Sequence, residues 1–96
     1  MNAEIKSRIE EMAQALEGKS TDLVEPDWWQ LYREGVVCLK RAARYLEVPD
    51  DVFSLEQAKA EIERAVVYLE REIVICYELQ YFCSVIRQNR DLLYEN

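Results

Sequence analysis

Residues 73–86, IVICYELQYFCSVI, decide whether this chain is entirely helical. Their β-branched and aromatic side chains would suit two short strands paired as a hairpin. The residues between the two candidate strands, Glu78-Leu79-Gln80, include none of the glycine, asparagine or aspartate residues that favour a tight hairpin turn. No turn residue separates the stretch from the helical pattern before it either. We therefore predict that residues 73–86 continue a helix and that the fold is all-α.

The helical pattern upstream of this stretch begins at a capping-box motif. In Ser54-Leu55-Glu56-Gln57 the serine is expected at the N-cap and the glutamine three residues later. The apolar residues that follow recur at helical spacing: Leu55, Ala58, Ile62, Ala65, Val66, Leu69 and Ile73. We predict a helix over residues 54–94, either continuous or broken once, near residues 70–72 or residues 88–89.

Two shorter helices are predicted before it. The spacing of Ile5, Ile9, Met12, Ala13 and Leu16 indicates a helix over residues 3–17, with Gly18 as the C′ residue that follows its end. A second helix over residues 26–47 begins with a proline, which suits the first turn of a helix. Gly35 interrupts the apolar stripe of this second helix at its centre. Glycine is costly inside a helix, so we expect another helix to cross closely there.

The length of the last helix predicts a partner. An unbroken helix over residues 54–94 would be about 60 Å long, whereas a globular domain of this size is roughly 25–30 Å across. The two shorter helices cannot cover it, and it is apolar on two sides. We therefore predict a single helical domain over residues 1–96, a bundle of three to four helices with a long C-terminal helix completed by dimerisation. The expected oligomer interface is one stripe of this helix: Ile75, Leu79, Phe82, Ile86 and Leu93. The other stripe is expected to face the first two helices: Tyr77, Tyr81, Val85 and Leu92.

The residues that most catalytic sites need are missing from the chain. It has no histidine, no phosphate-binding glycine loop and no Cys-x-x-Cys pair. A di-iron site in a helical bundle would need Glu-x-x-His. The glutamates offer no inward-facing pair on one helix and are interpreted as solvated: Glu10, Glu11, Glu61, Glu63, Glu70 and Glu72. We expect no catalysis, no metal site and no cofactor.

The cysteines and the first residues predict a cytoplasmic location. Cys38, Cys76 and Cys83 are odd in number and lie within apolar stretches, which is typical of reduced, buried thiols. The first residues, MNAEIKSRIEEMAQ, lack the apolar core of a signal peptide. No run of apolar residues is long enough to span a membrane, so we expect no contact with one.

Charge is unevenly distributed along the chain. The net charge of −7 argues against direct binding of nucleic acid, yet residues 31–46 hold four basic residues and one acidic residue. A stripe of the second helix combines a tryptophan with basic residues, a composition favoured at interfaces. We predict that it binds a partner protein through Trp29, Arg33, Lys40 and Arg44. The alternative is that these bases pair with Glu47, Asp50, Asp51 or acidic residues of the first helix.

Together these features favour a small acidic interaction protein, such as an adaptor, an assembly chaperone or an inhibitor. It would dock a helical surface on another protein, on a second copy of itself, or on both. The alternative function is an acidic mimic of nucleic acid, such as a phage or plasmid counter-defence protein. Glu56, Glu63 and Glu70 recur every seven residues, and a phosphate mimic needs carboxylates at such a regular spacing. Basic residues interspersed with them argue against the mimic: Lys59, Arg64 and Arg71.

Overall fold

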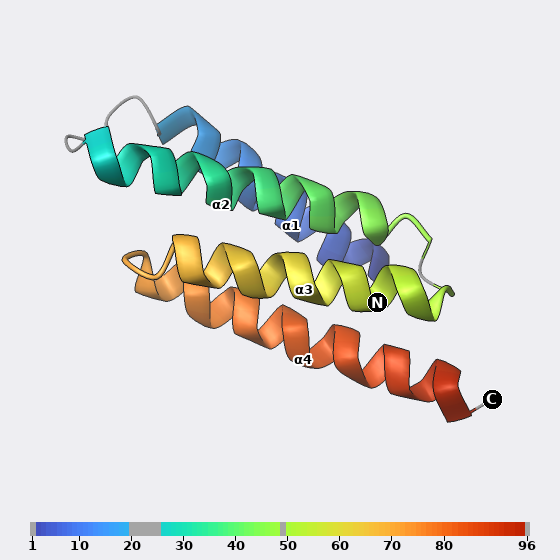
Figure 1. Ribbon diagram of the computed structural model, residues 1–96. Coiled ribbons are helices and arrows are strands. Elements are labelled where there is room, and N and C mark those ends of the chain that lie inside the picture. The colour runs from blue at the N-terminus through green and yellow to red at the C-terminus, as the bar shows by residue number, and fades with distance from the viewer. Residues whose placement is uncertain (1, 20–25, 49, 96) are drawn as a thin grey trace.

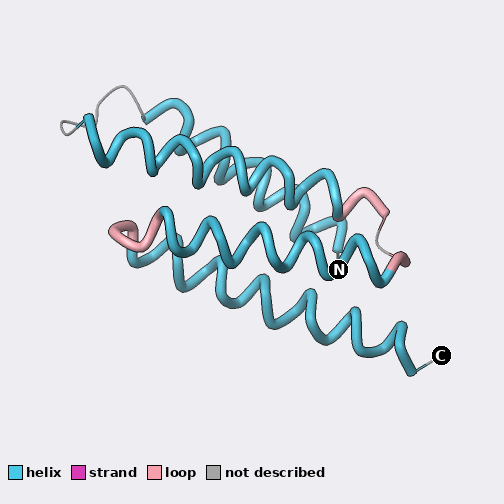
Figure 2. The backbone as a smooth tube through the Cα atoms, in the orientation of Figure 1, coloured by secondary structure: helices cyan, strands magenta, loops and turns pink. Residues whose placement is uncertain are grey.

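The computed structural model describes residues 2–19, 26–48 and 50–95. These residues form four α-helices: α1 (Asn2–Lys19), α2 (Pro26–Tyr45), α3 (Val52–Tyr68) and α4 (Ile73–Glu95) (Figure 1). The described ranges contain no strand (Figure 2). The prediction of an all-α bundle is confirmed, and residues 73–86 are helical throughout.

The helices form an elongated antiparallel bundle of 49 × 19 × 18 Å. Each helix runs opposite to the one before it, and the two ends of the chain lie at the same end of the bundle (Figure 1). Helices consecutive in the chain pack against each other. Between α1 and α4, Arg8 forms an ion pair with Glu78 and places its guanidinium 4.7 Å from the centre of the Phe82 ring. Side chains from all four helices meet in one apolar core.

The predicted long helix is broken once, between Tyr68 and Ile73. The turn contains neither glycine nor proline, and no described residue has a positive φ. The thiol of Cys76 donates a hydrogen bond to the carbonyl oxygen of Leu69 at 2.9 Å. The same oxygen accepts a hydrogen bond from the backbone N–H of Glu72 at 2.8 Å. Because the last carbonyls of a helix lack partners within it, these two hydrogen bonds stabilise the break. The break lies at one of the two predicted positions. Because α3 and α4 are two shorter helices, there is no helix about 60 Å long that a second chain would have to cover.

Leu69 also explains why a glycine is found in the middle of α2. A Cβ atom added to Gly35 would lie 2.6 Å from Cγ of Leu69, well inside van der Waals contact. Leu69 is fully buried at the C-terminal end of α3. The predicted close approach at Gly35 is therefore present. It is made by Leu69, the first residue of the turn between α3 and α4.

The observed helix ends differ from the predicted ones by at most two residues, and α2 ends at Tyr45 rather than at residue 47. Two of the predicted signals at helix ends are wrong. Helix α3 begins at Val52, so Ser54 lies in its first turn and is not its N-cap. Asp51 occupies the N-cap position, and its carboxylate accepts a hydrogen bond from the Ser54 hydroxyl at 2.8 Å. The predicted capping box is therefore wrong. Gly18 lies within α1, which continues to Lys19, and so is not a C′ residue.

Candidate interaction surfaces

The stripe predicted as an oligomer interface is part of the core of the chain. Leu79, Phe82 and Ile86 are each 0% exposed, and Ile75 and Leu93 pack against the core while partly buried. The reversal between α3 and α4 causes this, because it folds α4 back along α3 and turns this stripe inward. The assignment of Ile75, Leu79, Phe82, Ile86 and Leu93 to an oligomer interface is therefore corrected.

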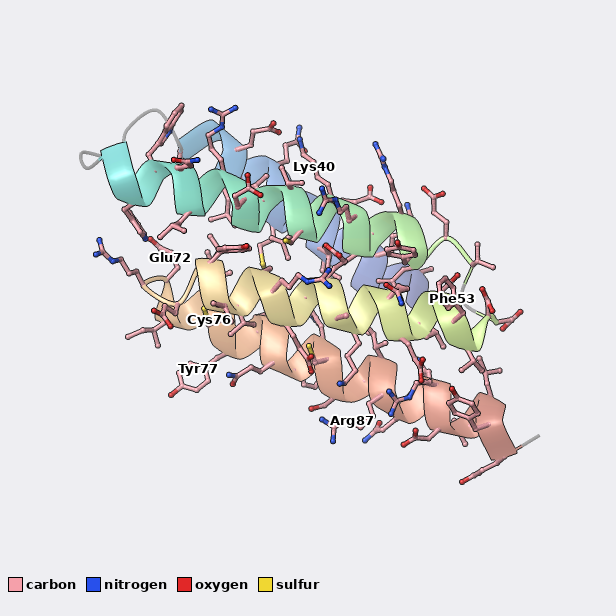
Figure 3. The ribbon with its side chains drawn as sticks, in the orientation of Figure 1. Lys40, Phe53, Glu72, Cys76, Tyr77 and Arg87 are labelled. Carbon is pink, nitrogen blue, oxygen red and sulfur yellow. The ribbon has the colours of Figure 1, made fainter. Side chains whose placement is uncertain are left out.

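The opposite side of α4 is open to solvent. Tyr77 is 70% exposed and Val74 is 79% exposed, and in Figure 3 the side chain of Tyr77 points away from the bundle. Tyr77 and Tyr81 were expected to face the first two helices and do not. Of that predicted stripe only Val85 is buried, and Leu92 is exposed as well. We call the exposed residues in the first part of α4 the outer α4 face: Ile73, Val74, Tyr77, Gln80, Tyr81 and Ser84.

The outer α4 face carries no charge, although 32% of the residues in the chain are charged. The sequence pattern predicted that Tyr77 and Tyr81 face the first two helices, although the tyrosines themselves indicate a surface in contact with water. Tyrosine has an apolar ring and a polar hydroxyl, so it suits a wet surface better than isoleucine, leucine or phenylalanine. The stripe with two tyrosines therefore faces solvent, and the stripe made only of aliphatic residues and phenylalanine faces the core.

Two shallow pockets follow the seam between α3 and α4. The first, of about 300 Å³, is bordered by Ile73 and Tyr77 of the outer α4 face, by Cys76 and by Glu70 of the turn between α3 and α4. The second, of about 310 Å³, is bordered by Cys83, Glu63 and Arg87. The two pockets thus lie between the outer α4 face and α3, and the charged residues Glu63, Glu70 and Arg87 border them.

The thiols are not activated as nucleophiles. All three cysteines are free and buried. Burial raises the pKa of Cys83 to about 11, with the Glu63 carboxylate as a smaller cause. Burial likewise raises the pKa of Cys38 and of Cys76. Since the thiolate is the nucleophile, all three side chains are protonated and unreactive near neutral pH.

Cys83→Ala is expected to reduce the loss of stability at alkaline pH. The unfolded thiol ionises near 9.0 and the folded thiol near 11, so deprotonation favours the unfolded chain between these values. This contribution is complete below pH 9 and is lost as the pH rises to 11. Urea unfolding at intervals across this range measures it, with the exposed Ser84→Ala as a control. An unchanged pH dependence in Cys83→Ala would contradict the assignment.

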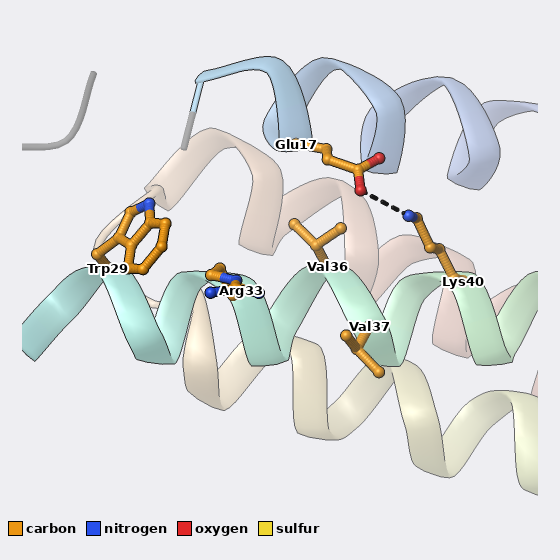
Figure 4. Close-up of a pocket in the computed structure, with 6 residues that line it drawn as sticks. All are labelled: Glu17, Trp29, Arg33, Val36, Val37 and Lys40. Carbon is orange, nitrogen blue, oxygen red and sulfur yellow. Dashed lines mark hydrogen bonds and ion pairs between the residues drawn. The ribbon is translucent and has the colours of Figure 1, made fainter. Parts of the chain in front are cut away.

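Three of the four residues predicted to bind a partner border one pocket on α2. Trp29, Arg33 and Lys40 surround a space of about 380 Å³ together with Val36, Val37 and Glu17 of α1 (Figure 4). Arg44 is exposed on the same helix but does not border the pocket. Three of the four predicted residues thus lie around one pocket, and Arg44 lies outside it.

The cations of this pocket already have contacts within the chain. The guanidinium of Arg33 lies 4.7 Å from the centre of the Trp29 ring. Lys40 Nζ lies 2.8 Å from Oε1 of Glu17 (Figure 4). The alternative that basic residues of α2 pair with the first helix therefore holds for Lys40. A ligand of this pocket would have to compete with that ion pair.

One acidic residue interpreted as solvated is buried. Glu61 of α3 is 4% exposed and forms ion pairs with Arg64 and, at 3.8 Å, with Arg41 of α2. A buried carboxylate needs such partners because its desolvation is costly. Glu61 therefore joins α2 to α3, and the interpretation of this residue as part of a solvated face is wrong.

Comparison of the chain with known protein families, with curated proteins and with solved structures found no match. Within the described ranges, no three cysteine, aspartate or glutamate side chains are grouped so that they could hold a metal ion. None of the described helices combines the length and the apolar character that crossing a membrane requires.

Proposed function

We propose that this protein is a non-catalytic interaction module that docks on another protein surface through the outer α4 face. The observation that carries the proposal is the exposure of four large apolar side chains on a single uncharged helix face: Ile73, Val74, Tyr77 and Tyr81. Contiguous exposed apolar surface of this kind marks interaction sites in soluble proteins. Tyrosine is also one of the residues that contribute most to binding energy at interfaces.

The physical advantage of docking at this face is the removal of apolar surface from water. Buried apolar area contributes roughly 25 cal/mol per Å², and the face holds no charge that would have to be desolvated. The rest of the surface of this acidic chain is rich in charged residues. Docking at α4 therefore gains the burial of apolar side chains and avoids the cost of desolvating charged ones.

The proposed role is that of an adaptor, an assembly chaperone or an inhibitor working in the cytoplasm. Three free, buried cysteines support a reducing compartment. The alternative, a mimic of nucleic acid, has less support. Lys59 neutralises Glu63 at 2.8 Å, and Arg90 lies 3.8 Å from Glu56, whereas a phosphate mimic should present unpaired carboxylates.

A photo-crosslinking side chain placed at position 77 tests the proposal. A benzophenone amino acid at this position, in cells that produce the protein, is expected to yield a discrete adduct on irradiation. The same group at Gln14, an exposed position of α1, is the matched control and is expected to yield none. Tyr81→Asp should abolish the adduct at position 77 by adding a charge to the face. Equal labelling at both positions, or none at either, would refute docking through α4.

A further inference from the structure

We infer that the surface that docks on the outer α4 face is the same face of a second copy of this chain, with the two α4 helices antiparallel. The inference rests on the proposed function and names its partner. Two properties of the outer α4 face support a second copy as the partner: the charges that border the face and its exposed area.

A chain with a net charge of −7 repels its own copies. In a dimer with two-fold symmetry the same patch is used by both subunits, so a charge near the symmetry axis would face an identical charge. The outer α4 face has no charged residue. Beside its centre, Glu78 is already neutralised by Arg8 of α1. This face therefore allows copies of an acidic chain to approach each other.

Opposite charges lie at the two ends of the outer α4 face. Glu70 lies at its beginning, beside Ile73 and Tyr77. Arg87 lies beyond its other end, on the same α3 side of α4, and in Figure 3 its side chain points outward from α4, as Tyr77 does. In an antiparallel pair whose two-fold axis passes between the two α4 helices, level with the midpoint of Tyr77 and Tyr81, Ile73 of one copy lies opposite Val85 of the other along the helix axis. Glu70, in the turn beside Ile73, and Arg87 of the other copy therefore lie at the same end of the interface.

This arrangement also pairs the aromatic side chains. Tyr77 of one copy lies opposite Tyr81 of the other, on both sides of the axis. A parallel pair of helices would instead oppose Glu70 to Glu70 and Arg87 to Arg87. Since like charges disfavour association, the antiparallel pair is the one that the charges select.

The area of the outer α4 face also suits a dimer. Tyr77 and Tyr81 are aromatic side chains of roughly 150–250 Å² each, and with Ile73 and Val74 they expose on the order of 500 Å² per copy. A stable interface of standard size buries about 800 Å² per partner. Gln80, Ser84 and the charged ends supply the remaining area as a polar rim, which is the usual anatomy of an interface.

A charge exchange tests the inference. Sedimentation equilibrium over micromolar concentrations is expected to show a dimer of twice the 11.4 kDa chain mass. Arg87→Glu and Glu70→Arg are each expected to raise the dimer dissociation constant about tenfold or more, because each acts at two symmetric contacts. The double variant Glu70→Arg/Arg87→Glu restores both contacts and should return to within about threefold of the natural chain. Far-UV circular dichroism verifies that every variant folds.

The outcomes separate this inference from the proposed function. A chain that stays at 11.4 kDa at every concentration overturns the second copy as the partner. If position 77 then crosslinks to a different protein, docking through α4 stands, and if it crosslinks to nothing, both proposals fail. A dimer whose double variant is no tighter than the single variants overturns the antiparallel pairing.

Discussion

Phe82→Ala is expected to lower the free energy of unfolding by about 3–5 kcal/mol. The ring is 0% exposed in the core, and Arg8 stacks on it from α1. Removing it leaves a cavity where α4 meets the rest of the bundle and deprives α1 of a contact. Because a small domain has only about 5–15 kcal/mol of net stability, the midpoint of urea unfolding, followed by circular dichroism, should fall steeply.

Tyr77→Ala is the matched control, since it removes an aromatic ring from the opposite side of the same helix. At concentrations where the chain is monomeric, its effect should stay within about 0.5 kcal/mol. If Phe82→Ala fails to fold, Phe82→Leu is expected to cost about 1.5 kcal/mol or less and tests the same point. Similar losses at positions 77 and 82 would contradict the assignment of the inner and outer sides of α4.

The sequence was sufficient to predict three features of the bundle. Helix at residues 73–86 followed from the lack of any turn residue, even though single residues there favour strands. The close approach at Gly35 followed from a glycine in an apolar stripe. The grouping of Trp29, Arg33 and Lys40 followed from helical spacing alone, because these residues share one face of α2. Local geometry determines the first and the third of these features. For the second, the sequence predicts that a helix crosses closely at Gly35 but not that Leu69 makes the contact.

The remaining features depend on contacts between distant residues. The turn between Tyr68 and Ile73 has no glycine or proline. It is stabilised by Leu69, which packs against Gly35, and by the thiol of Cys76. The sequence therefore allows this turn at residues 70–72, at residues 88–89 or not at all. The predicted dimer depended on the last of these cases, in which the helix is too long for the chain to cover.

The errors at the candidate sites have the same origin. Both stripes of α4 are apolar, and the reversal between α3 and α4 turns one of them to the core. The two tyrosines of the other stripe are the signal in the sequence for which one faces solvent. Glu17 completes the pocket on α2 from α1, and no pattern within α2 could indicate it. Glu61 pairs with Arg64, three residues later in its own helix, and with Arg41 of α2. The periodicity of α3 contains the first pair but not the second, which depends on how α2 packs against α3.

Gly35→Ala is expected to destabilise the protein by about 1–2 kcal/mol, the reverse of what helix propensity predicts. Alanine favours a helix by up to about 1 kcal/mol over glycine. The added Cβ, however, would lie 2.6, 2.9 and 3.1 Å from three carbons of the fully buried Leu69 side chain. Overpacking of this kind costs about 1–3 kcal/mol, which exceeds the gain in propensity.

Gly18→Ala provides the control of opposite sign. Gly18 is also helical, but a Cβ there meets no atom within 4 Å, so the substitution should stabilise α1 by about 0.4–1 kcal/mol. The Leu69→Ala background, which itself costs about 2–5 kcal/mol, isolates the contact. In that background the Cβ of Gly35→Ala enters vacated space, and the same substitution should become stabilising. If Gly35→Ala has one sign in both backgrounds, contact with Leu69 is not what requires glycine at this position.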